Sequence, residues 1–340
     1  MTPRDRSGRP AVPLKGIPPA VVTACLVAAP LGLGIGSGHD RAGASAALGA
    51  YLWAVSHLAL RRPIGIRVTT STAWLFGVAG ATGAFAGGHL WFLVVMAVGW
   101  ATFQAVADTA AGVLRMPVAM SALCFLLSAI GGGADLRGSL WRGVLVLGGT
   151  SWMVLCEMAR HAPWRSSDPG TPNLGIAELR AAWPRSRGYA LLLAIPTALA
   201  AGVAGLFAIS HGAWTATTVL RVLRPEESMT LVRSGRRIVG TASGALVAAL
   251  LLAIEPHAVT AVVVLVLSVS AMELIGPKRY GFYTFFLTLL ALELGSVGEA
   301  ASWHLALVRV ALTLVGAALA VSSGFLYDRI NRYRHRDPAP

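Results

Sequence analysis

Apolar runs of bilayer length recur along the whole chain, separated by short breaks that contain charged residues, glycine or proline. A helix needs about 20 predominantly apolar residues to cross a membrane. The pattern therefore predicts an all-α, polytopic membrane helix bundle with about 12 transmembrane spans. The predicted spans are residues 17–36, 43–60, 68–86, 88–106, 113–131, 140–158, 188–210, 211–223, 236–254, 256–275, 280–297 and 302–325. The eighth is the shortest, and its length leaves a partial crossing open.

The composition excludes an ordinary soluble domain. Hydrophobic residues make up 55% of the chain and charged residues only 13%, against about 25% charged in a typical globular protein. The first apolar run follows a basic tail but is too long for a secretory signal, so we interpret it as the first span. Cys25, Cys124 and Cys156 fall in separate apolar segments. They are predicted to be small buried hydrophobes rather than a disulfide or a metal site.

Two sequence echoes predict that the bundle is built from two similar halves. Residues 67–74 are echoed by residues 237–244, 170 positions later, and residues 142–149 by residues 309–316, 167 positions later. Each echo places an arginine at the start of an apolar helix rich in small residues. Six spans per half give both halves the same orientation, as two parallel six-span repeats, an arrangement typical of transporters.

This interpretation divides the chain into five parts. Prolines are expected to break any long helix in the linker between the repeats. The parts are a cytoplasmic basic tail 1–16, repeat one 17–158, a cytoplasmic linker 159–187, repeat two 188–326 and a cytoplasmic tail 327–340.

The distribution of positive charge tests the number of spans. With both termini inside, only Arg41, Arg137, Arg142 and Arg309 of the 28 Lys+Arg fall on the outer side. The positive-inside rule favours this asymmetry, which predicts a multi-pass protein of the inner (plasma) membrane with both termini cytoplasmic. The formal net charge of +13 is then a topology signal that also attracts anionic membrane lipids. The basic residues are scattered over many short loops, which argues against a nucleic-acid partner.

Ionisable residues at membrane depth are expensive, so each is a candidate for function. Arg142 and Arg309 occupy matching positions in the last span of each repeat. As a pair they are predicted to line one pathway and attract an organic anion. The alternative is that each extends to the outer interface or pairs with an acid such as Asp135 or Glu293.

Further arginines are expected at the inner mouth, where Arg61-Arg62 corresponds to Arg224 and Arg67 to Arg237. The alternative for most of these charges is ordinary positive-inside anchoring. Guanidinium groups hold carboxylates through two parallel hydrogen bonds, so these arginines are predicted to bind substrate. Gly240, Thr241 and Gly244 allow close helix approach and are expected to face the central path. Arg67 with Arg237, and Arg142 with Arg309, would then form two tiers along it.

Three acids are candidates for proton coupling. Asp108 precedes Arg115, and Glu273 precedes Lys278 and Arg279, at the inner ends of matching spans. Salt bridges to these cations are favoured over proton transfer for both. Glu293 lies deeper in its span and has no acidic counterpart, so it is the better single proton carrier. His57 is a weaker candidate, because a lone histidine on an apolar helix is more often a packing residue.

The sequence offers no enzymatic constellation. It lacks the Gly-rich loop with lysine that binds nucleotide phosphates, and its histidines lack metal-binding spacing, so neither cofactor nor metal is expected. The alternative to transport is a membrane-embedded enzyme, or an assembly partner, acting on a lipophilic metabolite.

One ordered block of the second half resembles a known family. It comprises residues 211–216, with Trp214, then Leu223-Arg224-Pro225 and then residues 237–244. Together with residues 307–316 it resembles the fusaric acid resistance (FUSC-like) family of aromatic acid exporters, and the first half resembles it more faintly. The resemblance implies efflux of aromatic or other organic carboxylates, and its motif contains Trp214, which joins Arg224 and Thr241 among the substrate-binding candidates. Plant aluminium-activated malate transporters resemble the same six-span unit, used as a dimeric anion channel.

The chain also departs from the family pattern. Many bacterial members carry large cytoplasmic domains between and after the halves, where residues 159–187 and 327–340 are short. A homo-oligomer or a periplasmic adaptor therefore stays open as a partner. In the first half, Thr70 and Trp74 replace Gly240 and Gly244, so the repeats are not expected to contribute equally to a site.

Overall fold

A computed structural model describes residues 18–334 of the chain, apart from 61–65, 111, 131–132, 134, 161–175, 210, 226, 255–257, 277–278 and 297–302. The described residues form helices and no strands, which confirms the all-α prediction. The helices are α1 Pro19–Gly36, α2 Asp40–Leu60, α3 Ile66–Ala86, α4 Leu90–Ala110, α5 Arg115–Ile130, α6 Leu136–Arg160, α7 Ile176–Leu206, α8 Ala213–Val222, α9 Glu227–Ile254, α10 Ala258–Ile275, α11 Tyr280–Ser296 and α12 Trp303–Arg334.

Six of these helices are long and apolar enough to cross a membrane by length and composition: α1, α4, α6, α7, α9 and α12. Helices α5, α10 and α11 are apolar but shorter. Helix α8 has 10 residues and is therefore about 15 Å long, half the hydrocarbon thickness. A count of 12 full crossings stays a prediction.

Three helices, α7, α9 and α12, extend well beyond their predicted spans. Helix α7 begins at Ile176, so the second part of the predicted linker is helical, and Pro184 lies inside the helix instead of ending it. Proline removes the hydrogen bond to the carbonyl four residues earlier. That residue, Arg180, is exposed, so water can hydrate the released carbonyl. Helix α9 begins at Glu227 rather than near residue 236, and α12 runs on to Arg334.

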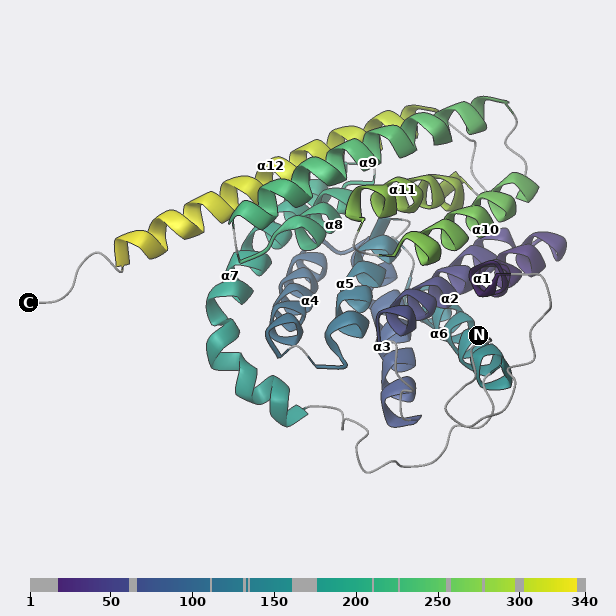
Figure 1. The fold of residues 1–340 in the computed structure, drawn as a ribbon, viewed down its shortest axis with the longest axis horizontal. Helices are drawn as coiled ribbons and strands as arrows, with labels where there is room; N and C mark the ends of the chain where they lie inside the picture. Colours follow the sequence, from purple (N-terminus) through teal and green to yellow (C-terminus); the bar gives the residue numbers. More distant parts are fainter. Residues whose placement is uncertain are drawn as a thin grey trace, which may run out of the picture.

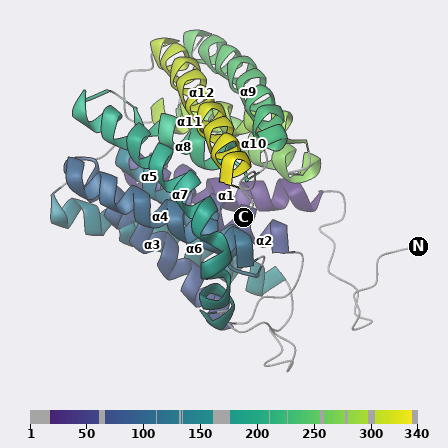
Figure 2. The ribbon, with the colours of Figure 1, turned by 90° about the vertical axis from the view of Figure 1, so that its left-hand side faces the viewer.

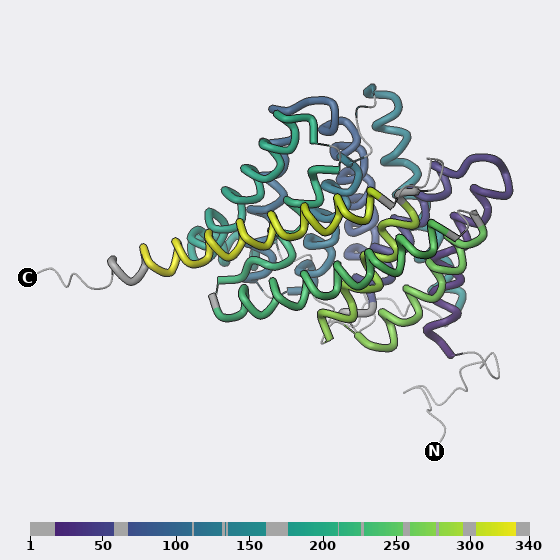
Figure 3. The backbone as a smooth tube through the Cα atoms, turned by 90° about the horizontal axis from the view of Figure 1, so that it is seen from above, coloured from purple at the N-terminus to yellow at the C-terminus, as the bar shows by residue number. Residues whose placement is uncertain are grey.

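The helix pairs of the first half recur six helices later (Figures 1 and 2). In the first half the packed pairs are α1 with α2, α2 with α6, α3 with α6, α3 with α5 and α4 with α5. In the second half they are α7 with α8, α8 with α12, α9 with α12, α9 with α11 and α10 with α11. The halves meet where α4 packs along α7 and α1 along α10. Figure 1 shows α9 and α12 running side by side along the top of the bundle, and Figure 3 shows the same two helices from above.

Glycines bring several of these helices into backbone contact. A Cβ on Gly149 would collide with the Ala46 carbonyl of α2, and one on Gly240 with the Gly281 carbonyl of α11. A Cβ on Gly244 would lie 2.5 Å from the Phe285 carbonyl oxygen, also on α11. The prediction of close helix approach at Gly240 and Gly244 is confirmed. The prediction that they face a central path is wrong, because α11 covers both.

Candidate functional site

The short helix α8 carries one polar face toward the interior of the second half. Trp214, Thr218 and Arg221 follow one another at helical spacing, so they share that face. Trp214 and Thr218 are buried. Arginines from α9 and α12 converge on the same face.

Arg309 of α12 lies over the Trp214 ring, with its guanidinium carbon 4.3 Å from the ring centroid. The residue is only 2% exposed. Its Nε and Nη1 atoms have no hydrogen-bond partner among the described residues. A cation over an indole face is a favourable contact, but it leaves the in-plane N–H donors of the guanidinium available.

Arg237 of α9 lies within electrostatic reach of Arg309. It is 1% exposed. Its Nε donates to the Thr218 hydroxyl at 3.3 Å, and its Nη1 donates to the Tyr280 hydroxyl at 3.3 Å. Nη2 is buried without a partner in the described part of the chain.

Neither arginine forms an ion pair with a carboxylate in the described part of the chain. Two buried like charges without a counter-ion are strongly unfavourable, by several kcal/mol per ion. An anion between them would accept hydrogen bonds from the unsatisfied donors and compensate both charges. The pair Arg237 and Arg309 therefore has the chemistry of an anion site.

A second group of polar residues extends from this pair. Arg221 of α8 donates from Nη2 to the Met120 sulfur at 3.4 Å. Tyr51 of α2 and Tyr283 of α11 join their hydroxyls at 3.1 Å, and both tyrosines lie within electrostatic reach of Arg221. Sequence reasoning missed Arg221, Thr218 and the tyrosines. The spacing of Trp214, Thr218 and Arg221 on one helical face was the available signal.

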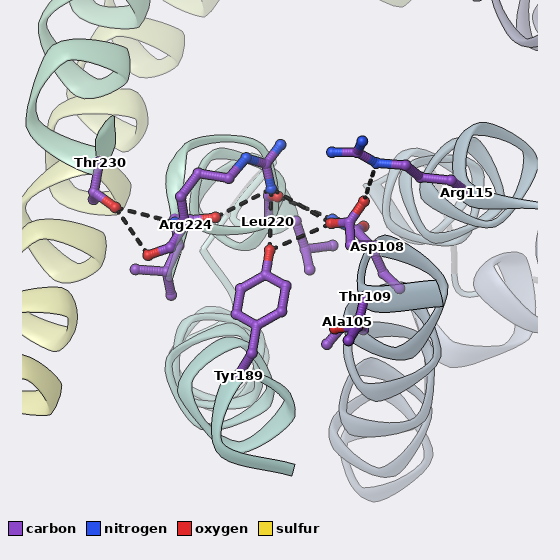
Figure 4. A network of polar contacts seen from close by, with 10 residues as sticks. Ala105, Asp108, Thr109, Arg115, Tyr189, Leu220, Arg224 and Thr230 are labelled. Atoms are coloured by element: carbon purple, nitrogen blue, oxygen red, sulfur yellow. Dashed lines mark hydrogen bonds and ion pairs between the residues drawn. The ribbon is translucent and has the colours of Figure 1, made fainter. Parts of the chain in front are cut away.

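Arg224, just after α8, belongs to a network that joins the two halves (Figure 4). Its Nη1 donates to the Tyr189 hydroxyl at 3.1 Å and lies 3.6 Å from Asp108 Oδ2. Arg115 also pairs with Asp108, at 3.0 Å, so the predicted contact of these two residues is present. Burial by itself lowers the pKa of Arg224, but Tyr189 and Asp108 outweigh it and raise this pKa above its ordinary value. Arg224 is therefore charged and held by α4 and α7.

The predicted arginine pairs are not brought together. Arg67 is exposed near the start of α3, whereas Arg237 lies ten residues into α9, because α9 begins earlier relative to the echo. Arg142 donates to the Ser128 carbonyl of α5 at 3.1 Å and is partly buried. The described side chains thus form one two-arginine group in the second half rather than two matched tiers.

The remaining candidates lie apart from this group. Thr241 is buried against α11, accepting a hydrogen bond from Thr288 at 3.4 Å. Glu293 is 3% exposed near the end of α11. Glu273 lies near the end of α10 and feels the charge of Arg160. Arg61, Arg62, Lys278 and the two tails 1–16 and 335–340 lie outside the described residues.

Comparison with known proteins identifies the second half. Residues 182–322 match the family described as fusaric acid resistance protein-like, so the predicted resemblance is confirmed over this segment. Together with the apolar helices, this match indicates a multi-pass membrane protein.

Three curated relatives are uncharacterized proteins. One from Synechocystis sp. is 30% identical over 144 residues, 42% of this chain and 19% of the relative. One from Haemophilus influenzae is 30% identical over 132 residues, 39% of this chain and 18% of the relative. One from Neisseria gonorrhoeae is 28% identical over 132 residues, 39% of this chain and 32% of the relative. The match thus spans at most a third of these longer relatives, and no solved structure matches the chain.

Proposed function

We propose, from the fusaric acid resistance protein-like match of residues 182–322 and the two buried arginines, that this chain exports organic anions across the inner (plasma) membrane. The observation that carries the proposal is that Arg237 and Arg309 are buried against successive turns of α8, within electrostatic reach of each other and without a carboxylate partner in the described chain, and retain unused N–H donors. A site with this charge favours an anion over a neutral or cationic solute.

Aromatic carboxylates are the proposed substrate class. Trp214 and Tyr280 form aromatic walls beside the two guanidinium groups. A carboxylate would take the free donors of the arginines, and a flat ring would pack against these side chains. The apolar wall offsets the desolvation of the ring, and the paired arginines offset that of the carboxylate.

The proposed topology follows the charge pattern, with both termini cytoplasmic and two parallel repeats. The recurrence of the same helix pairs six helices later supports the repeats. In this orientation the ends of α2, α4, α6, α8 and α10 face the cytoplasm. Arg309 and Trp214 are nearer the outer side, and Arg237 lies about one turn of α8 further in.

Reconstituted protein tests the proposal. Proteoliposomes loaded with fusaric or hydroxybenzoic acid should release the acid faster than liposomes prepared without protein. The double variant Arg237→Ala, Arg309→Ala should lose this release, whereas Arg180→Ala, an exposed arginine on α7, should keep it. Release by the double variant at the wild-type rate would remove the site from the pathway. Absence of release by the wild type, with the protein shown to be folded, would contradict the function.

A further inference from the structure

An apolar groove runs along the contact between α4 and α7, where the two halves of the chain meet (Figure 2). It encloses about 790 Å³. Its lining includes Val94, Val98 and Thr102 of α4 and residues of α7 from Trp183 to Leu206. The groove is therefore separate from the arginines of α9 and α12 that form the proposed anion site.

Small residues form the floor of the groove on α7. Ala190, Ala194, Ala198 and Gly202 follow one another at intervals of four and so share one face of the helix. Large apolar side chains at positions 191, 195, 199 and 203 border this face and are exposed. In a multi-pass membrane protein, exposed apolar side chains face the lipid hydrocarbon. The groove is thus open to the bilayer along its length.

The charge of the groove lies at one end. Among the described lining residues, Arg187 alone is charged. It is exposed, and its guanidinium carbon lies 6.0 Å from the centroid of the Trp183 ring. Tryptophan and arginine side chains are typical of the level at which the hydrocarbon meets the headgroups. Tyr189 donates to Asp108, near the end of α4, at 3.3 Å, so this end of the groove is cytoplasmic in the proposed topology.

The length of the groove matches the bilayer. From Arg187 to Leu206 the helix rises about 28 Å, close to the hydrocarbon thickness of about 30 Å. From Arg187 to Ala198 it rises about 16 Å, which is the depth of one leaflet. A lipid of the inner leaflet with its phosphate beside Arg187 would therefore lay its acyl chain along the alanine floor.

We propose that the inner half of this groove binds one anionic phospholipid, with an acyl chain between α4 and α7 and the phosphate hydrogen bonded to Arg187. A guanidinium group can donate two parallel hydrogen bonds to a phosphate. Trp183 supports the guanidinium plane and leaves its in-plane donors available. The bound lipid touches both halves and stabilises their contact. The proposal does not depend on anion export.

Charge complementarity favours a lipid over a second copy of the chain. Two copies related by an axis along the membrane normal place equivalent residues at the same depth. A dimer formed through this groove would bring the two Arg187 side chains toward each other. An anionic headgroup instead brings the opposite charge, and basic pockets between membrane helices on the cytoplasmic side suit such headgroups.

Native mass spectrometry of the purified protein in neutral detergent tests the proposal. Phosphatidylglycerol and phosphatidylcholine with the same acyl chains are added in turn. The wild type should retain one phosphatidylglycerol with about fivefold or higher affinity than phosphatidylcholine. Arg187→Gln should remove most of this preference, because it removes the charge-assisted hydrogen bonds. Arg185→Gln makes the same change at an exposed α7 residue outside the lining and should bind as the wild type does.

A second pair of variants tests the position of the acyl chain. Ala198→Phe fills the inner half of the groove and should weaken the binding of both lipids by similar factors. Ala318→Phe, at an exposed position on α12, is the matched control. Glycerol phosphate, a headgroup without acyl chains, should not displace the bound lipid.

Three results would overturn the proposal: equal affinity of the wild type for the two lipids, equal losses from Arg187→Gln and Arg185→Gln, or displacement by glycerol phosphate. A lipid-free dimer that Ala198→Phe dissociates would assign the groove to a second copy and would overturn it as well. None of these measurements uses transport, so failure of the proposed export leaves them unchanged.

Discussion

The two halves of the chain carry the same arginine echoes and use them differently. In the second half, Arg237 and Arg309 are both buried and converge beside Trp214. In the first half, Arg67 is exposed and Arg142 is hydrogen bonded to a carbonyl of α5. The difference arises from helix register, because α9 starts earlier than α3 relative to the echo, and α8 is shorter than α2. The same helix pairs thus recur in both halves, while the described residues bring two buried arginines together only in the second half.

The largest difference between the halves is expected when one arginine of each half is neutralised. Arg309→Gln should reduce transport by at least about tenfold, because it removes charge-assisted hydrogen bonds worth about 1.5–3 kcal/mol. Arg142→Gln should change it by less than about twofold, because the Ser128 carbonyl it contacts can bind a glutamine amide instead. Initial efflux rates from proteoliposomes with equal protein content measure both. Equal losses would mean that both halves contribute to the pathway.

Substitutions in the two echoed segments should change the free energy of unfolding by different amounts. Gly240→Ala adds a Cβ that meets the Gly281 carbonyl, so α9 and α11 must separate, and we expect a loss of about 1–3 kcal/mol of unfolding free energy. Trp74, at the position that matches Gly244, is 59% exposed, so Trp74→Ala should cost less than about 0.5 kcal/mol. Denaturation of the purified variants in detergent gives both values. A neutral Gly240→Ala would contradict the close contact.

The matched acids should also differ in stability. Asp108→Asn removes the ion pairs to Arg224 and Arg115, and we expect a loss of about 1–2 kcal/mol since Arg224 stays buried. Glu273→Gln removes the cost of burying a charge, an attraction to the exposed Arg160 and a repulsion from Glu157, so stability should change by less than about 1 kcal/mol. The same denaturation assay at neutral pH compares the stability of the two variants. A large loss from Glu273→Gln would contradict this difference between the two acids.

The smallest effect is expected at Trp214, the aromatic residue that Arg309 covers. Trp214→Phe keeps a ring beneath Arg309 but weakens the cation–π contact, by about 0.5–1 kcal/mol. We therefore expect substrate affinity to fall by about two- to fivefold. Trp141→Phe, at an exposed tryptophan of the first half, is the control and should leave affinity unchanged. Binding of a labelled aromatic carboxylate to purified protein measures both changes.

The order and type of the helices could be predicted from the sequence, because apolar runs and their breaks are local features. The start of α9 could not be predicted. Its first turns carry Arg233, Arg236 and Arg237, and these charges indicate a loop when only hydropathy is considered. Pro184 was predicted to end a helix but lies inside α7. The helix continues through it where Arg180, whose carbonyl loses its hydrogen bond, is exposed to solvent.

The candidate site was predicted only in part. Arg237 and Arg309 were identified because charge at membrane depth is costly wherever it occurs. Their convergence, and the separation of Arg67 from Arg142, depend on how α8, α9 and α12 pack. The contact between His57 and Glu157 joins α2 to α6, and no local spacing connects these two residues.

The glycine contacts between α9 and α11 restrict how the protein can move. Two backbones that touch at Gly240 with Gly281 and at Gly244 with Phe285 cannot slide or rotate past each other without a collision. We therefore expect the two helices to move as one rigid body, so that Arg237 and Tyr280 keep their hydrogen bond. Spectroscopic labels on α9 and α11 should keep a fixed separation when substrate is added, whatever the change between labels on α9 and α4.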